Sequence, residues 1–385
     1  MRIIIYKKLK NLQKKLIDFN MKMIRWNEPR FGKEEIEEVR KVIEANYVNE
    51  GPKTKEFEEK IKKYLGVSNV ILTTNATAAL FLSVKAEALL RNVDDFEVIV
   101  PDMTMLATAS AVNWAGGKPI PVDVKKDDLT IDPTKIEDKI TPKTIAVIPV
   151  HVLGRSADMD KITEIAKRHN LAVIEDAAGA LGSKYKNNSY LGTIGKVGCF
   201  SLQSNKIITS GQGGIIATAD QRLYELIRRL RDFGRASNKE FLHEIAGFNL
   251  KFNDLSAALG CAQFDRIEER KSLLLDQYNQ YKKNLEGIEK VKLFSIKDGE
   301  VPLWIDIIAN DRNNLVRFLS SNEISTRDCW PALHRNKPYR EFGSDENFPN
   351  ASFASDSILW LPNGPAVSSE DINFICSKIK EFYKK

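Results

Sequence analysis

The sequence predicts an α/β fold, in which a mainly parallel β-sheet lies between layers of helices and a smaller α+β domain follows. The first observation is that short β-rich runs alternate with helical patterns between residues 70 and 176, as in successive βαβ units. The second is the long helical pattern of residues 255–285, after which strands and helices follow a different order. The third is the length of 385 residues, which suits two domains.

Each element follows from its local pattern. Amphipathic spacing predicts helices, runs of β-branched residues predict buried strands, and Gly66 after Leu65 is typical of a helix end. We expect helices at 33–45, 54–65, 76–90, 108–115, 159–169, 255–285, 313–321 and 369–383. We expect strands at 70–73, 97–100, 119–122, 144–149, 172–175, 199–202, 290–294 and 303–308. The chain then divides into an N-terminal extension (1–23), a large domain (24–270) and a small C-terminal domain (271–385).

The composition is that of an ordinary globular protein, with 43% hydrophobic and 29% charged residues. The formal net charge is +6, but residues 1–25 hold eight bases and one acid, so the remainder is close to neutral. We therefore do not expect the body of the protein to bind nucleic acid.

The N-terminal extension has the pattern of a basic amphipathic helix, which is typical of weak contact with an anionic membrane surface. Its apolar side chains fall on one helical face: Ile5, Leu9, Leu12, Leu16 and Phe19. Two alternatives remain open. The helix packs on its own protein, or the segment is an upstream start, since Met21 and Met23 precede the regular pattern.

The cysteines and histidines do not form a disulfide framework or a metal motif. The four cysteines lie far apart without a CxxC pair, and the four histidines lack ligand spacing. No run of about 18 apolar residues occurs, and the N-terminus does not resemble a cleaved signal. We expect a reduced, cytoplasmic protein without a metal site.

The stretch from Val173 to Gly214 is the most informative part of the sequence. A buried strand ends at Asp176 and is followed by small residues, and Lys206 lies between the next strand and a glycine loop. In a parallel sheet, ligands bind at the carboxyl ends of the strands. A lysine and an aspartate there suit pyridoxal 5'-phosphate, whose aldehyde bonds to an amine and whose ring nitrogen needs a carboxylate.

The phosphate of such a cofactor needs hydroxyls and backbone N–H donors. Thr74, Asn75, Ala76 and Thr77 follow a strand and open a helix, where unpaired amides and the positive dipole end favour an anion. Ser201 adds a hydroxyl. Each feature alone also has an ordinary structural explanation, such as a helix cap or a solvated lysine, so the prediction depends on their order and spacing.

The chain resembles the DegT/DnrJ/StrS sugar aminotransferases, a branch of the fold type I pyridoxal-phosphate enzymes. The resemblance covers about residues 25–380. It is carried by these stretches in the family's order: Asn49–Pro52, Thr74–Leu80, Pro149–Gly154, Ala157–Asp160, Glu175–Ala178, Ser201–Gly214, Phe248–Asn249 and Trp330–Tyr339.

The resemblance implies roles for individual residues. Lys206 matches the Schiff-base lysine that also moves the proton, and Asp176 matches the partner of the pyridine nitrogen. Asn249 matches an asparagine that, in the family, reaches the cofactor phosphate of the other subunit, which implies a homodimer with shared active sites. Three residues match the phosphate-binding positions: Ala76, Thr77 and Ser201.

Some cofactor positions depart from the family pattern. Met105 stands where an aromatic residue usually covers the ring, a contact that methionine can also make. Gly179 stands where glutamine or histidine is frequent, so a hydrogen bond to the cofactor's 3-hydroxyl is in doubt. Lys251 replaces a frequent arginine, and Gln212 a frequent glutamate.

Within the family, three stretches most resemble the GDP-perosamine synthase group: His151–Gly154, Trp330–Asn336 and Leu361–Pro365. This resemblance implies transfer of an amino group from L-glutamate to C4 of a nucleotide-linked 4-keto-6-deoxyhexose, for surface polysaccharide synthesis. His334 and Arg335 are candidates for contact with the sugar or diphosphate, and His151 is a third substrate-binding candidate.

Other activities remain open. One keeps the cofactor but changes the reaction, to a dehydratase, amination at C3 or a cyclitol acceptor. Lys206 argues against the sugar 3-dehydratase branch, where histidine replaces the lysine. Another is a catalytically silent pyridoxal-phosphate-binding regulator. An oxidoreductase is disfavoured because no GxGxxG motif follows the first strand.

Overall fold

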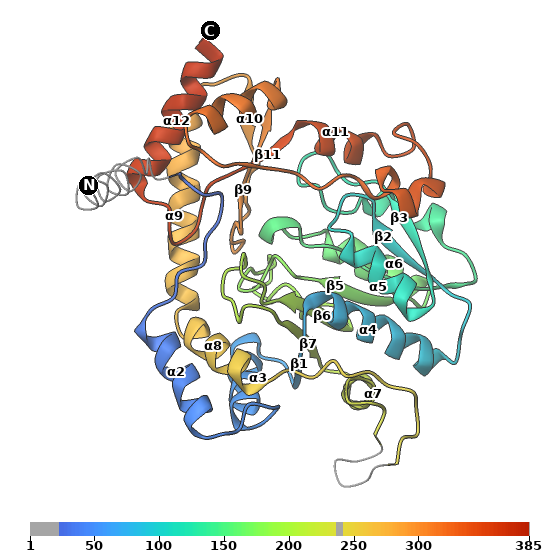
Figure 1. Cartoon of the computed structure of the whole chain (residues 1–385). Coiled ribbons are helices and arrows are strands. Elements are labelled where there is room, and N and C mark those ends of the chain that lie inside the picture. The colour runs from blue at the N-terminus through green and yellow to red at the C-terminus, as the bar shows by residue number, and fades with distance from the viewer. Residues whose placement is uncertain (1–22, 236–241, 385) are drawn as a thin grey trace, which may run out of the picture.

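The computed structural model describes residues 23–235 and 242–384, and the large sheet forms the centre of the molecule (Figure 1). In these ranges the sheet has the strand order β1-β7-β6-β5-β4-β2-β3. Strands β3, β2, β4, β5 and β6 run parallel, whereas β7 runs antiparallel to both β6 and β1. The strands are β1 (Asn69–Thr73), β2 (Glu97–Pro101), β3 (Lys118–Val122), β4 (Thr144–Val147), β5 (Ala172–Asp176), β6 (Val197–Ser201) and β7 (Gly214–Thr218).

Helices cover both faces of the large sheet because the strands are apolar on both sides. Successive strand residues point to opposite faces, so Ile71 and Ile216 pack into one hydrophobic core while Leu72 and Ile215 pack into the other. The helices of this part are α2 (Lys33–Glu44), α3 (Pro52–Leu65), α4 (Ala76–Arg91), α5 (Ala107–Ala115), α6 (Met159–Arg168), α7 (Gln221–Arg231) and α8 (Asp254–Phe264).

A second, antiparallel sheet has the order β10-β11-β9-β8 and packs with the C-terminal helices on a separate core. Its strands are β8 (Val291–Leu293), β9 (Ile305–Ala309), β10 (Arg327–Asp328) and β11 (Ile358–Leu361). Its helices are α9 (Ile267–Leu285), α10 (Arg312–Ser321), α11 (Pro349–Ser357) and α12 (Ser369–Lys384). The short 3₁₀ helices are η1 (Pro133–Lys135), η2 (Glu137–Lys139), η3 (Val152–Gly154), η4 (Leu333–Arg335) and η5 (Lys337–Phe342).

The two sheets are joined by buried polar contacts as well as by α9. The guanidinium of Arg155 donates two hydrogen bonds of 2.8 Å to the carboxylate of Asp306 on β9. The described N-terminal residues also contact the second sheet region, since Ile24 pairs with Ile324 and the Asn363 N–H donates to the Trp26 carbonyl. Ile24 and Trp26 come just after residue 23, where the sequence predicts that the N-terminal extension ends.

The α/β fold with a mainly parallel sheet is confirmed, and the differences from the predicted elements are local. The expected helix 255–285 is two helices that break at Asp265 and Arg266, where α8 packs on α2 and α3 while α9 packs on α12. The sequence prediction omitted β7, α7, β10, α11 and β11. The expected amphipathic helix of the N-terminal extension falls outside the described residues. Within them, no helix has the length and apolar character that spanning a membrane requires.

Candidate active site

The carboxyl edge of the large sheet brings the predicted phosphate-binding residues together. Gly214 pairs with both Thr73 on β1 and Ser201 on β6, so the ends of these strands share one register. A Cβ atom at Gly214 would lie 2.3 Å from the carbonyl oxygen of Asn75, closer than van der Waals contact allows. Glycine at this position therefore lets the Ser201 strand end approach the N-terminus of α4.

The N-terminus of α4 offers free backbone donors. Asn75 caps the helix, and its side chain accepts a hydrogen bond of 2.8 Å from the Ala78 N–H. The N–H groups of Ala76 and Thr77 come too early in the helix to have an intrahelical acceptor. Together with the positive end of the helix dipole, they form a site suited to a phosphate.

Asp176 ends β5 as a buried carboxylate with fixed orientation. Its Oδ2 accepts a hydrogen bond of 2.8 Å from the hydroxyl of Thr108, and its Oδ1 accepts one of 3.1 Å from the Ala178 N–H. Burial raises the pKa of Asp176, whereas these two donors and the charge of Lys206 lower it. A protonated ring nitrogen beside Asp176 would stabilise the ionised carboxylate further.

Lys206 lies in the turn after β6, and its amine lies over an aromatic ring. The Nζ atom is 5.2 Å from the centre of the Trp304 ring, and that indole is fixed because its Nε1–H donates to the Asn205 carbonyl at 3.1 Å. Burial lowers the pKa of Lys206 to about 8, although the charge of Asp176 acts in the opposite direction. A substantial fraction of the amine is therefore neutral near physiological pH.

A cavity of about 290 Å³ connects these groups. Seven of the residues predicted from the sequence line it: Ala76, Thr77, Met105, Asp176, Gly179, Ser201 and Lys206. Met105 lies 51% exposed at this site, and a Cβ atom at Gly179 would already touch Leu303 and Leu153. The structure thus brings the expected amine, carboxylate and phosphate donors into one cavity.

His151 also lines the cavity, but both of its ring nitrogens are engaged. Its Nε2 lies 2.8 Å from the Glu175 carboxylate, and its Nδ1 lies 3.2 Å from the Ala157 N–H. Since Nδ1 accepts a hydrogen bond, the proton is assigned to Nε2, which donates to Glu175. His151 therefore presents no free nitrogen to a substrate.

The structure does not bring His334, Arg335 or Asn249 to this cavity. The polar atoms of His334 and Arg335 face Asp102, Asp345 and Asp356 instead. Asn249 is exposed and lies in a separate cavity of about 1080 Å³, which several arginine side chains also line.

Several residues of the site were not predicted from the sequence, among them Thr108, Trp304 and Trp330. Thr108 lies 68 positions before the carboxylate it contacts, and no local spacing connects the two. The sequence did contain one sign of the role of Thr108, because this residue lies four positions after Thr104 in a segment that follows the end of a predicted strand. Trp330 opens a stretch that resembles the family, but that resemblance gave it no role.

Comparisons with known proteins show which family the chain belongs to. The model of the DegT/DnrJ/EryC1/StrS aminotransferase family matches residues 29–380. The GDP-perosamine synthase of Escherichia coli O157:H7 is 33% identical over 368 residues, which cover 94% of this chain and 99% of that protein.

Solved structures of sugar aminotransferases are similar to this chain in fold. The structure of DesI in the presence of its TDP-sugar product has a TM-score of 0.86 and 26% identity, covering 94% of this chain and 93% of that one. The PLP form of the putative sugar aminotransferase Spr1654 from Streptococcus pneumoniae has a TM-score of 0.86 and 25% identity, covering 94% of this chain and 98% of that one.

Proposed function

Because this chain belongs to the DegT/DnrJ/EryC1/StrS aminotransferase family, we propose that it transfers the amino group of L-glutamate to C4 of a nucleotide-linked 4-keto-6-deoxyhexose. The enzyme is a pyridoxal-phosphate-dependent transaminase. The choice of a perosamine-type product is supported by the relative in Escherichia coli, which is named for it. We place the reaction in the cytoplasm, in the synthesis of a surface polysaccharide.

The cavity residues fit pyridoxal phosphate by their chemistry. Asp176 provides a buried carboxylate for the ring nitrogen, Lys206 provides a primary amine, and the N-terminus of α4 with Ser201 provides neutral donors for the phosphate. Met105 is assigned to one face of the ring. When bound, the cofactor supplies an electron sink, which makes the hydrogen on the amine-bearing carbon acidic.

The protein's own residues then direct the proton. Lys206 is the group that removes and returns it, because burial lowers its pKa towards the pH at which an amine can both accept and donate. Thr108 and Ala178 hold the Asp176 carboxylate in one orientation, and the negative charge of that carboxylate would keep the ring nitrogen of the bound cofactor protonated. The single observation that carries the proposal is that one cavity is lined by the Lys206 amine, the buried Asp176 carboxylate and the N-terminus of α4.

The activity test uses purified protein, L-glutamate and a panel of nucleotide-linked keto sugars. We expect more than one equivalent of 2-oxoglutarate per site to form only with a 4-keto-6-deoxy sugar, because glutamate alone can donate its amino group only once to each cofactor. We expect a Lys206→Ala variant to form none. Release with a 3-keto sugar alone would replace the C4 assignment. The absence of 2-oxoglutarate with every sugar would favour a regulator that only binds the cofactor.

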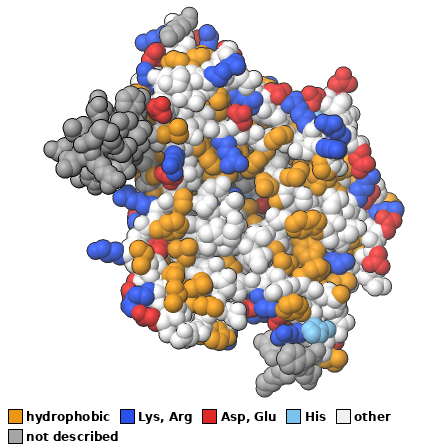
Figure 2. Space-filling view, viewed as in Figure 1, with side chains coloured by type: hydrophobic (Ala, Val, Ile, Leu, Met, Phe, Trp, Pro, Cys, Tyr) orange, Lys and Arg blue, Asp and Glu red, His pale blue; other side chains and the backbone are white. Residues whose placement is uncertain are grey.

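We propose further that the enzyme is a homodimer in which Asn249 acts in the other subunit's site. Asn249 is exposed and lies outside the cavity of its own chain. Large apolar side chains are exposed beside the site, and Figure 2 shows hydrophobic side chains gathered over the face that carries α4 and α5: Met105 (51%), Leu106 (37%) and Trp114 (65%). Such a patch is typical of an interface.

Subunit complementation tests this arrangement. Lys206→Ala and Asn249→Ala variants are each purified, mixed under conditions that exchange subunits, and assayed. If Asn249 acts across the interface, hybrid dimers contain one intact site and part of the activity returns. If Asn249 acts in its own chain, both sites of the hybrid are defective and no activity returns.

A further inference from the structure

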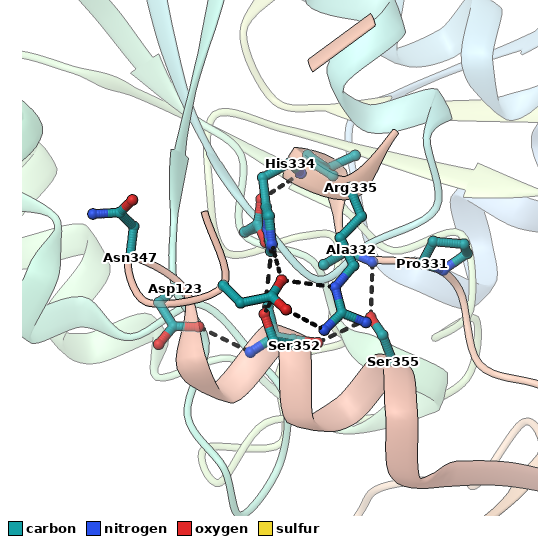
Figure 3. A network of polar contacts seen from close by, with 12 residues as sticks. Asp123, Pro331, Ala332, His334, Arg335, Asn347, Ser352 and Ser355 are labelled. Atoms are coloured by element: carbon teal, nitrogen blue, oxygen red, sulfur yellow. Dashed lines mark hydrogen bonds and ion pairs between the residues drawn. The ribbon is translucent and has the colours of Figure 1, made fainter. Parts of the chain in front are cut away.

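His334 is a buried histidine whose two ring nitrogens both face carboxylates. Its Nδ1 lies 2.6 Å from Oδ2 of Asp102, and its Nε2 lies 2.8 Å from Oδ1 of Asp345. The side chain is 3% exposed and its ring stacks on Phe348 at 5.0 Å. Figure 3 shows His334 and Arg335 projecting from the same short helix, η4, towards α11.

The partner on the inner side, Asp102, is fully buried and directly follows β2. Its Oδ1 accepts the backbone N–H of His334 at 3.0 Å, and its carbonyl oxygen accepts the Leu333 N–H at 2.7 Å. Burial raises the pKa of Asp102, and the bonds from His334 oppose that rise. The N–H of Asp102 donates to the Val122 carbonyl at 2.8 Å, but its carboxylate and its carbonyl oxygen are held by η4, a segment more than two hundred positions later in the chain.

Asp102 begins a segment that forms part of the lining of the active-site cavity. Thr104 and Met105, two and three residues after it, line that cavity. Thr104 also lies 2.8 Å from the hydroxyl of Thr108, which in turn donates to Asp176. A shift of Asp102 would move both the ring-covering Met105 and the hydrogen bonds that orient Asp176.

The segment that carries His334 provides another part of the cavity lining. Trp330, four residues before His334, lines the same cavity. The Ala332 N–H donates to the hydroxyl of Ser355 on α11 at 2.8 Å, so the segment between Trp330 and His334 is fixed at both ends. The contact between His334 and Asp102 therefore connects two segments of the cavity lining that are far apart in the chain.

We propose that His334 is a positioning residue, which sets the relative position of the segments that carry Met105 and Trp330 in the cofactor cavity through its contact with Asp102. The proposal rests on the assignment of this cavity to pyridoxal phosphate. The exposed side of the segment has a different role. Arg335 donates to Asp345 and Asp356, and neither carboxylate contacts Asp102, so these ion pairs fasten the segment without reaching the cavity.

Two substitutions of His334 distinguish the contributions of its two ring nitrogens. The amide nitrogen of His334→Asn replaces Nδ1 and keeps a donor towards Asp102, whereas that of His334→Gln replaces Nε2 and keeps a donor towards Asp345. The readouts are the dissociation constant of pyridoxal phosphate, followed by quenching of tryptophan fluorescence, and the visible circular dichroism of the bound cofactor. We expect about tenfold weaker binding and a reduced dichroic signal for His334→Gln, and values near wild type for His334→Asn.

The carboxylates give a matched second pair. Asp102→Asn is expected to weaken cofactor binding about tenfold, whereas Asp345→Asn, which alters the other partner of the same ring, is expected to leave it within about twofold. Equal effects of the two carboxylate variants, or of the two His334 variants, would overturn the proposal. If His334→Gln does not fold, the carboxylate pair decides alone.

A separate control distinguishes failure of this proposal from failure of the site assignment. Loss of the visible cofactor signal in Lys206→Ala tests whether the cavity is the cofactor site. If the wild type and Lys206→Ala behave alike, the site assignment fails. If they differ while the two pairs of variants do not, only the role of His334 fails.

Discussion

Lys206 should lower the stability of the cofactor-free protein, and its replacement by methionine should raise it. One unit of pKa corresponds to about 1.4 kcal/mol, so lowering the pKa of Lys206 from 10.5 to about 8 costs the folded state about 3 kcal/mol at pH 7. Methionine has a similar unbranched shape without the charge. We expect Lys206→Met to be more stable at pH 7 by up to about 3 kcal/mol.

The pH dependence of this difference identifies its cause. Below pH 8 both the folded and unfolded states carry the proton, so the wild type bears the whole cost of the buried charge. Between pH 8 and about 10.5 the folded state releases the proton first, so wild-type stability relative to Lys206→Met rises with pH. Above that range both states are neutral and the charge contribution vanishes. Any gain from burying the methionine itself does not depend on pH.

The assay is urea unfolding of both cofactor-free proteins at pH 7 and pH 10, compared by the free energy of unfolding. Lys53→Met is the control, since the Lys53 ammonium lies 2.6 Å from Glu38 and 2.8 Å from Glu56, and these neighbours raise its pKa. That variant should lose stability at pH 7. A Lys206→Met advantage that is equal at both pH values, or absent at pH 7, would refute the reasoning.

Three further predictions concern other contacts. Thr108→Val removes a hydrogen bond to the Asp176 carboxylate that contributes about 1.5–3 kcal/mol, so kcat/KM should fall at least about tenfold. Thr108→Ser keeps the hydroxyl and should have a kcat/KM near that of the wild type. Equal losses in the two variants would contradict this prediction. The rate of pyridoxal phosphate capture by cofactor-free protein should rise with pH to a plateau, with a midpoint near pH 8 as the Lys206 amine loses its proton. Asp176→Asn should move that midpoint lower, since Asp176 raises the Lys206 pKa; a higher midpoint contradicts it. Arg155→Met leaves Asp306 buried without its partner and should cost about 3–5 kcal/mol by thermal unfolding, less in combination with Asp306→Leu.

The sequence was sufficient to predict the fold class and the central pair of the site, for a physical reason. Asp176 is the last residue of a buried strand and Lys206 follows the next strand, and the carboxyl ends of parallel strands meet at one edge of a sheet. The local pattern therefore implied spatial proximity. Strand β7 was not predicted, because the glycine loop that ends at Gly214 was interpreted only as part of the site and the apolar residues that follow Gly214 were not assigned to a strand.

The partners that orient the site could not be predicted in the same way. Thr108 and Asp176 are 68 positions apart, and His334 and Asp102 are 232 apart. Such contacts depend on how segments far apart in the chain pack together, and local spacing does not report this packing. The stretch around His334 resembled the family and so suggested a substrate contact, but its nitrogens are already engaged by carboxylates. A motif thus located an important residue without indicating what it contacts.

The charge of the described cavity lining explains why the overall charge of the chain was a poor guide to its ligand. Lys206 is the only lysine or arginine among the residues that line the cavity within the described ranges. The donors that we propose for the phosphate are the backbone of α4 and the Ser201 hydroxyl, which are neutral. An additional cation beside Lys206 would lower the pKa of its amine further and weaken it as a proton acceptor. Binding the phosphate through neutral donors therefore leaves the basicity of Lys206 under the control of burial and of Asp176 alone.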